Sequence, residues 1–85
     1  MLMANMSIAD IQPRALTALR NSPIYELHDL AVEQQIGKLL LSGNVSSFYH
    51  KQLAQEVVWA VCKNFEVELV NLVEVNNAGR FAGDE

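Results

Sequence analysis

The stretch "GKLLLSGNVSSFYHKQLAQEVVWAV", from Gly37 to Val61, decides the fold because its apolar spacing changes halfway along. In its first part, apolar residues recur at even intervals, with Leu39, Leu41 and Val45 in one phase. That spacing is typical of a β-strand with one buried face. We therefore predict a strand over "KLLLSGNV", which gives way to a helix just beyond Gly43.

The second part of the stretch has helical spacing. We predict a helix over residues 47–63 with Ser46 or Ser47 as its N-cap, because a serine hydroxyl can accept a hydrogen bond from a free amide of the first turn. At about 100° per residue, one arc of this helix is apolar and is expected to face the core. The arc consists of Tyr49, Leu53, Val57, Ala60 and Val61.

Upstream of this stretch, the sequence predicts another helix and another strand. The helix is expected to begin between Ile8 and Pro13 and to end at the "NSP" that starts at Asn21, since proline suits a first helical turn and stops a helix that reaches it. The segment "IYELHDLAV", residues 24–32, has strand character, and "EQQIG" then supplies a turn. Two strands joined by a short turn are expected to pair antiparallel.

Downstream, "FEVELVNLVEV" over residues 65–75 alternates as a half-buried strand does. The phase expected to face the core consists of Val67, Leu69, Asn71, Val73 and Val75. The order is α-β-β-α-β, and a right-handed crossover through the second helix would make the last two strands parallel. We therefore predict the α+β class: a two-layer sandwich in which two helices cover one face of a three-stranded mixed sheet.

The composition describes one small folded domain. The 85 residues are 51% hydrophobic and 19% charged, with a formal net charge of −4. An acidic balance gives no general attraction for nucleic acid, which is not expected as a partner. We expect a disordered segment over residues 1–7, a single domain over 8–75 and a flexible tail over 76–85. Without a signal peptide or membrane span the chain as given would be cytoplasmic, or in the envelope or periplasm if it belongs to a longer exported protein.

The chemically reactive residues are few and are not grouped. Cys62 is the single cysteine, so no intrachain disulfide can form. His28 and His50 lack the neighbouring groups that a metal site or a general base needs. We therefore expect no catalytic residue, no metal and no cofactor, and interpret the chain as a non-enzymatic protein.

The junction of strand and helix has two interpretations. The residues Gly43, Ser46 and Ser47 could present backbone amides at a helix N-terminus to an anion such as a lipid phosphate or a carboxylate. They could also be a strand-to-helix turn with a serine cap, which by itself explains the residue types. The spacing of a nucleotide-binding P-loop is absent.

Several apolar side chains point away from the expected core. Trp59 lies on the helix face opposite Val57, together with Phe48, while Val70 and Leu72 lie in the outer phase of the last strand and Tyr25 extends that surface. Exposed apolar groups of this kind mark a contact surface for a partner or a lipid. Alternatively the chain ends cover them, through Phe81 or the leading methionines.

The spacing of the hairpin and the last strand resembles the BON domain, a small module of bacterial envelope, osmotic-stress and secretin-associated proteins. The resemblance covers roughly residues 10–75. The matching positions are Leu30, Val32, Gly37, Leu39, Leu41, Gly43, Val45, Leu69, Asn71, Val73 and Val75. It implies a non-catalytic module that attaches to membrane phospholipid or to a partner protein, which includes self-association without lipid binding. A less favoured alternative is a single-stranded nucleic-acid binder.

Overall fold

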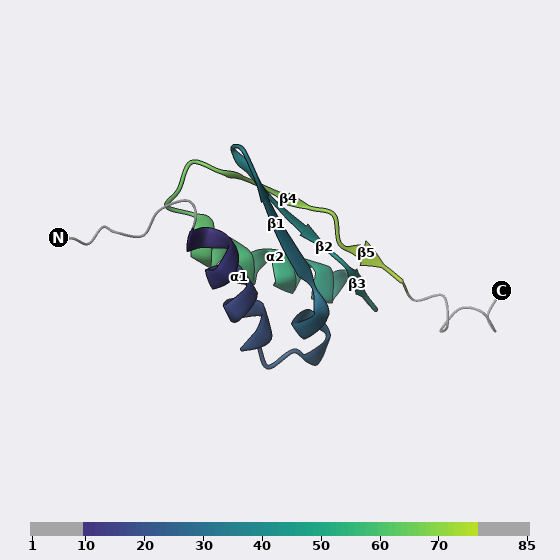
Figure 1. The fold of residues 1–85 in the computed structure, drawn as a ribbon. Helices are drawn as coiled ribbons and strands as arrows, with labels where there is room; N and C mark the ends of the chain where they lie inside the picture. The colour runs from purple at the N-terminus through teal and green to yellow at the C-terminus, as the bar shows by residue number, and fades with distance from the viewer. Residues whose placement is uncertain (1–9, 77–85) are drawn as a thin grey trace, which may run out of the picture.

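The computed structural model describes residues 10–76, and in it two α-helices lie on one side of a β-sheet (Figure 1). The elements in chain order are α1 (Ile11–Arg20), the 3-10 helix η2 (Tyr25–Asp29), β1 (Ala31–Gln35), β2 (Lys38–Ser42), β3 (Asn44–Val45), α2 (Phe48–Cys62), β4 (Glu68–Asn71) and β5 (Glu74–Val75). The predicted α+β class and the order α-β-β-α-β are confirmed. The expectations for residues 1–7, for Phe81 and for the tail beyond residue 76 lie outside the described residues.

The main sheet has three strands in the order β1-β2-β4 and is mixed, as predicted. β1 and β2 form an antiparallel hairpin in which Val32 lies opposite Leu41. β4 pairs parallel to β2, with Leu69 beside Leu39, so α2 is the crossover between them. Two consecutive parallel strands need such a crossover because the chain leaves the first strand at one end of the sheet and must enter the second strand at the other end.

The long strand predicted over "KLLLSGNV" is interrupted at Gly43. This glycine has φ +132°, a backbone conformation that residues with a side chain rarely adopt. Beyond it, β3 turns away from β2 and pairs parallel to β5, with Val45 beside Val75. The bend moves the chain from the sheet to the start of α2.

The core lies between the helices and the inner face of the sheet. Alternate residues of the strands enter it, as the spacing predicted: Val32, Leu39 and Leu41 are all buried. From α1, Ile11, Ala15 and Leu19 are buried at intervals of four residues, which is one helical face. The apolar residues of both layers therefore meet in a single cluster.

The predicted strand over residues 24–32 is wrong for most of its length. Tyr25–Asp29 form the 3-10 helix η2, in which the Leu27 amide donates to the Ile24 carbonyl. The side chain of Leu27 is fully buried. This apolar residue, which suggested a strand, therefore fills the core from a 3-10 helix. The strand begins at Ala31 and continues through Gln35, part of the segment expected to be a turn.

The predicted boundaries of the second helix are confirmed, and Ser47 is its N-cap. The predicted core face is wrong, because the fully buried residues of α2 are Ala54, Val58 and Cys62. Tyr49 is 68% exposed and Ala60 is also exposed, whereas the other members of the predicted arc, Leu53, Val57 and Val61, are partly buried against the core. One residue of offset rotates a helix by about 100°, and the small Ala54 is fully buried in the core cluster.

Candidate binding surface

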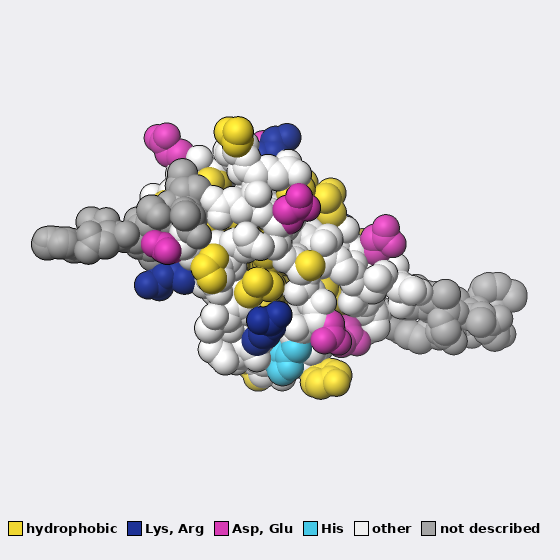
Figure 2. All heavy atoms as spheres, in the orientation of Figure 1, with side chains coloured by type: hydrophobic (Ala, Val, Ile, Leu, Met, Phe, Trp, Pro, Cys, Tyr) yellow, Lys and Arg dark blue, Asp and Glu magenta, His cyan; other side chains and the backbone are white. Residues whose placement is uncertain are grey.

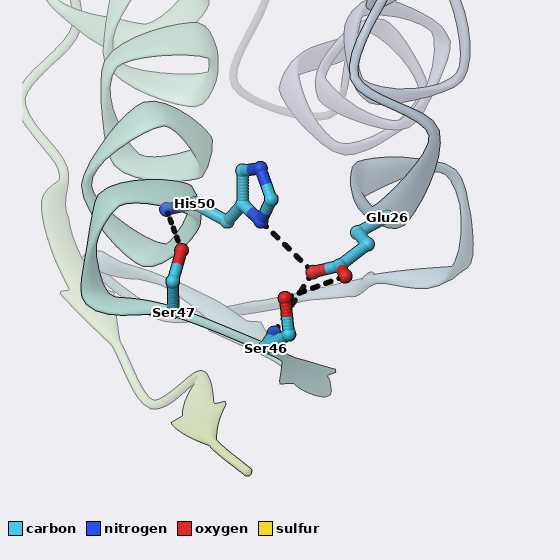
Figure 3. Close-up of polar contacts among 4 residues, drawn as sticks. All are labelled: Glu26, Ser46, Ser47 and His50. Carbon is cyan, nitrogen blue, oxygen red and sulfur yellow. Dashed lines mark hydrogen bonds and ion pairs between the residues drawn. The ribbon is translucent and has the colours of Figure 1, made fainter. Parts of the chain in front are cut away.

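The N-terminus of α2 is held by a carboxylate from η2. Glu26 accepts two hydrogen bonds from Ser46: one from its backbone amide at 2.8 Å and one from its hydroxyl at 2.7 Å (Figure 3). The next residue, Ser47, caps the helix, since its hydroxyl accepts a hydrogen bond from the His50 amide at 3.2 Å. A negative charge in this place also interacts favourably with the helix dipole.

His50 completes this cluster. Its Nδ1 lies 3.0 Å from Oε1 of Glu26, and because an ionised carboxylate can only accept, Nδ1 carries the proton. The hydroxyl and the amide of Ser46 hold the pKa of Glu26 below its ordinary value, and His50 adds to this while partial burial opposes it. Glu26 is therefore ionised at neutral pH.

This geometry bears on the candidate anion site at Gly43, Ser46 and Ser47. The Ser46 amide already donates to the Glu26 carboxylate, which lies where an external anion would bind. The carbonyl of Gly43 accepts from the Glu74 amide at 2.9 Å, next to the pairing of β3 with β5. A pocket of about 300 Å³ beside this junction is lined by Glu26 and Asp29 and by no basic residue, so its charge favours a cation over an anion.

The same cluster contains a serine, a histidine and a carboxylate, but not in the order that nucleophilic catalysis needs. In a catalytic triad the histidine lies between the hydroxyl and the acid, so that it can take the hydroxyl proton. Here the carboxylate of Glu26 lies between Ser46 and His50. A carboxylate with a lowered pKa is also a weak base. The arrangement thus fits the anchoring of α2.

The remaining reactive side chains have structural surroundings. Nε2 of His28 donates to the Ser22 carbonyl at 2.7 Å, and its ring meets Tyr25 edge-on. Cys62 is fully buried, and burial raises the pKa of its thiol, which disfavours the reactive thiolate. Among residues 10–76, no three His, Cys, Asp or Glu side chains are grouped so as to hold a metal ion.

A mainly apolar groove of about 510 Å³ lies between α2 and β4 and is called the Trp59 groove. Trp59 is 49% exposed, so its indole forms part of the groove wall and is not a core side chain. The groove is lined by Gln52, Gln55, Glu56 and Trp59 of α2 and by Val67, Glu68 and Leu69 of the facing segment. A concave apolar surface with a half-exposed tryptophan is typical of a binding site.

The backbone of β4 borders this groove with an unpaired edge. The amide of Glu68 donates to the Gly37 carbonyl just before β2 at 2.9 Å, and the amide of Leu72 donates to the Leu41 carbonyl of β2 at 2.7 Å. Residues 68, 70 and 72 therefore present their peptide groups to that strand. Successive residues of a strand alternate, so Leu69 and Asn71 present theirs to the opposite side. In the part of the chain that the structure describes, no strand pairs with that side of β4.

Asn71 links α2 to β4 through hydrogen bonds. Its side-chain amide donates to the Lys51 carbonyl at 3.1 Å and to Oε1 of Gln55 at 3.2 Å. Its Oδ1 accepts a hydrogen bond from the Val73 amide at 3.1 Å. One side chain therefore joins the helix to the strand and also shapes the bend from β4 to β5.

The structure separates the residues that the sequence proposed as one surface. Trp59 lies in the groove, while Val70 and the 52% exposed Leu72 belong to the outer face of the sheet. Phe48 is exposed in the first turn of α2, and Tyr25 lines the smaller pocket beside Ser46. The sequence did not indicate that Val67 and Leu69 line the groove, because their phase predicted that they face the core. Both are only partly buried.

Comparison of the sequence with models of protein families finds no match, and comparison with curated proteins finds none either. Within residues 10–76, neither α-helix has the length and hydropathy that crossing a bilayer requires.

Proposed function

We propose that this chain is a non-catalytic binding module, resembling BON domains, that contacts a partner protein through the Trp59 groove. The observation that carries the proposal is the half-exposed Trp59 in a groove next to the unpaired edge of β4. Tryptophan is the residue type most enriched among those that dominate binding energy, because it buries a large rigid area at low entropic cost.

The cluster at the start of α2 supports a non-catalytic role. Its three functional groups stabilise a helix terminus, and their order does not activate the Ser46 hydroxyl. The lining of the Trp59 groove in turn contains no serine, cysteine, lysine or histidine. The cluster therefore has a structural role, and the groove is suited to apolar contact with a partner.

Attachment to phospholipid is the second candidate, and one observation favours it. Ile36 at the tip of the β1–β2 hairpin is fully exposed, as an apolar side chain that inserts into a bilayer interface would be. Charge opposes binding to anionic lipid, since the net charge is −4. In the face drawn in Figure 2, basic side chains are scattered singly among acidic ones, and the same pattern disfavours nucleic acid.

The test is a selection of binders from a random-peptide phage library on the immobilised full chain. Selected peptides are then measured on two variants, Trp59→Ala and Tyr49→Ala. The second is the matched control, because Tyr49 is an exposed aromatic residue of the same helix that does not line the groove. We expect Trp59→Ala to weaken binding by about tenfold or more and Tyr49→Ala to leave it within about twofold.

Flotation with neutral and with anionic vesicles is run beside the selection. Peptide binders that depend on Trp59, with no flotation, support the protein partner. Flotation that is lost in an Ile36→Ser variant, with no Trp59-dependent peptide, would replace the proposal by the lipid alternative. Absence of any binder in both assays contradicts a binding module at this surface.

A further inference from the structure

We propose that the occupant of the Trp59 groove is an extended, positively charged peptide that adds as a further strand to the free edge of β4. This rests on the proposed function, because it names the partner class for the same groove. Strand addition to a sheet edge is a recurring mode of peptide recognition in which main-chain hydrogen bonds supply affinity and alternate side chains supply specificity. Three features of the groove fit this mode.

The first feature is the direction of the β4 backbone. Leu69 and Asn71 present their N–H and C=O groups away from β2, at the free edge of the sheet. An extended peptide laid along β4 would supply partners for these groups. The opposite edge of the sheet is different, because the Gln12 side chain of α1 donates to the Val32 carbonyl of β1 at 2.8 Å.

The second feature is the pair of surfaces that an added strand would meet. Its side chains must alternate between the two faces of the sheet. On the helix side they would enter the groove and pack on Trp59 and Val67. On the outer side they would lie beside the outward-facing side chains of β4, such as Val70, which is itself paired with Leu40 of β2. The groove side therefore selects an apolar residue at every second position.

The third feature is charge. Glu56 and Glu68 are the charged residues among those that line the groove, and no lysine or arginine is present there. A peptide that carries lysine or arginine at its other alternate positions places these charges on the outer side of the sheet, where Glu68 lies in the same phase of β4 as Val70. A second copy of the chain does not complement the charge, because pairing β4 with its own copy would bring two sets of these glutamates together.

The probe is a capped octapeptide, Lys-Val-Thr-Val-Lys-Val-Thr-Val, added to the full chain, with amide hydrogen exchange followed residue by residue. We expect exchange at Leu69 and Asn71 to slow by about tenfold or more at saturation, since both amides gain an acceptor. Exchange at Val70 should not change, because its amide faces β2. This alternation separates an added strand from any other way of filling the groove.

Two peptide controls test the backbone and the charge without altering the fold of the protein. N-methylation of one alternate set of peptide residues should weaken binding by about tenfold or more, and methylation of the other set should leave it within about twofold. The peptide with both lysines replaced by glutamate should bind about threefold to tenfold more weakly. The same loss is expected for Glu56→Gln combined with Glu68→Gln, and Glu33→Gln on β1 serves as its control.

Equal effects of the two methylation patterns, or protection that does not alternate along β4, would overturn strand addition. Failure of this peptide to bind, while library peptides still require Trp59, would overturn strand addition and leave the proposed function standing. A chain that sediments as a dimer whose own β4 amides are protected in the same alternating pattern would show a second copy as the occupant and would likewise overturn the peptide partner.

Discussion

The carboxylate of Glu26 accepts hydrogen bonds from both the amide and the hydroxyl of Ser46, twenty residues away along the chain. This relationship fastens η2 to the N-terminus of α2. It also supplies an internal negative charge at a helix terminus, where an external anion would otherwise bind. The strand-to-helix junction therefore has a structural role, and the hydrogen-bonded pair of Glu26 and Ser46 is called the Glu26 joint.

Replacing Glu26 by glutamine should destabilise the fold. The variant keeps one acceptor oxygen but loses the charge and one of the two hydrogen bonds to Ser46, so we expect the free energy of unfolding to fall by about 1 kcal/mol. Urea denaturation measures this difference. Glu66→Gln, the same change at an exposed position, is the control and should have little effect. Equal stability of the two variants would show that the joint contributes nothing.

The Glu26 joint also predicts a dependence on pH. The pKa of Glu26 is lower in the folded chain than its ordinary value, chiefly because of Ser46, so the folded state binds fewer protons there than the unfolded state. The joint should therefore stabilise fully above an ordinary glutamate pKa of about 4.3 and lose its contribution as pH falls below that value. The stability difference between wild type and Glu26→Gln, measured from about pH 6 to pH 3, should shrink as the pH falls below about 4.3. A constant difference across this range would contradict the assignment.

The orientation of α2 predicts which of its valines matters most for stability. Val58 is fully buried and Val57 only partly, so Val58→Ala should cost about 2 kcal/mol and Val57→Ala less than about half as much. Thermal and urea unfolding of both variants give the comparison. A larger loss of unfolding free energy for Val57→Ala would instead support the core face that helical periodicity alone predicted.

The two glycines of the hairpin region should respond unequally to alanine. At Gly43, φ is +132° and an added Cβ would lie 2.6 Å from Cδ2 of Leu30, so both the backbone and the packing oppose a side chain. At Gly37, φ is +74° and nothing lies near the added Cβ. We expect Gly37→Ala to cost about 1 kcal/mol and Gly43→Ala about 2 kcal/mol or more in unfolding free energy. Similar losses at both positions would argue against the close approach at Leu30.

The sequence predicted the strands and helices well where apolar spacing had a single solution. Leu39 and Leu41 are buried and Ser47 caps α2, as expected. It failed where the spacing was ambiguous: "VVWAVC" is apolar on nearly every side, so periodicity could not determine whether Val57 or Val58 faces the core. Tertiary packing of Ala54 and Val58 decided the orientation instead.

The candidate site was only partly predictable for a similar reason. An outward-facing Trp59 follows from helix geometry, and the structure leaves it half exposed. The groove beside Trp59 depends on how closely β4 approaches α2. The hydrogen bonds from the Asn71 side chain to Lys51 and Gln55 link these two elements. A contact between segments that lie sixteen and twenty residues apart carries no signal in local spacing. The joint between Glu26 and Ser46 was missed because η2 was predicted to be a strand.

Fluorescence of Trp59 reports directly on binding in the Trp59 groove, because Trp59 is the single tryptophan of the chain and lines that groove. The measurement is acrylamide quenching and the emission maximum of the full chain, with and without a saturating library-selected peptide that lacks tryptophan. We expect the bound peptide to reduce quenching and to move the emission to shorter wavelength. A peptide that binds by calorimetry and leaves both properties unchanged would contradict the Trp59 groove as the binding surface.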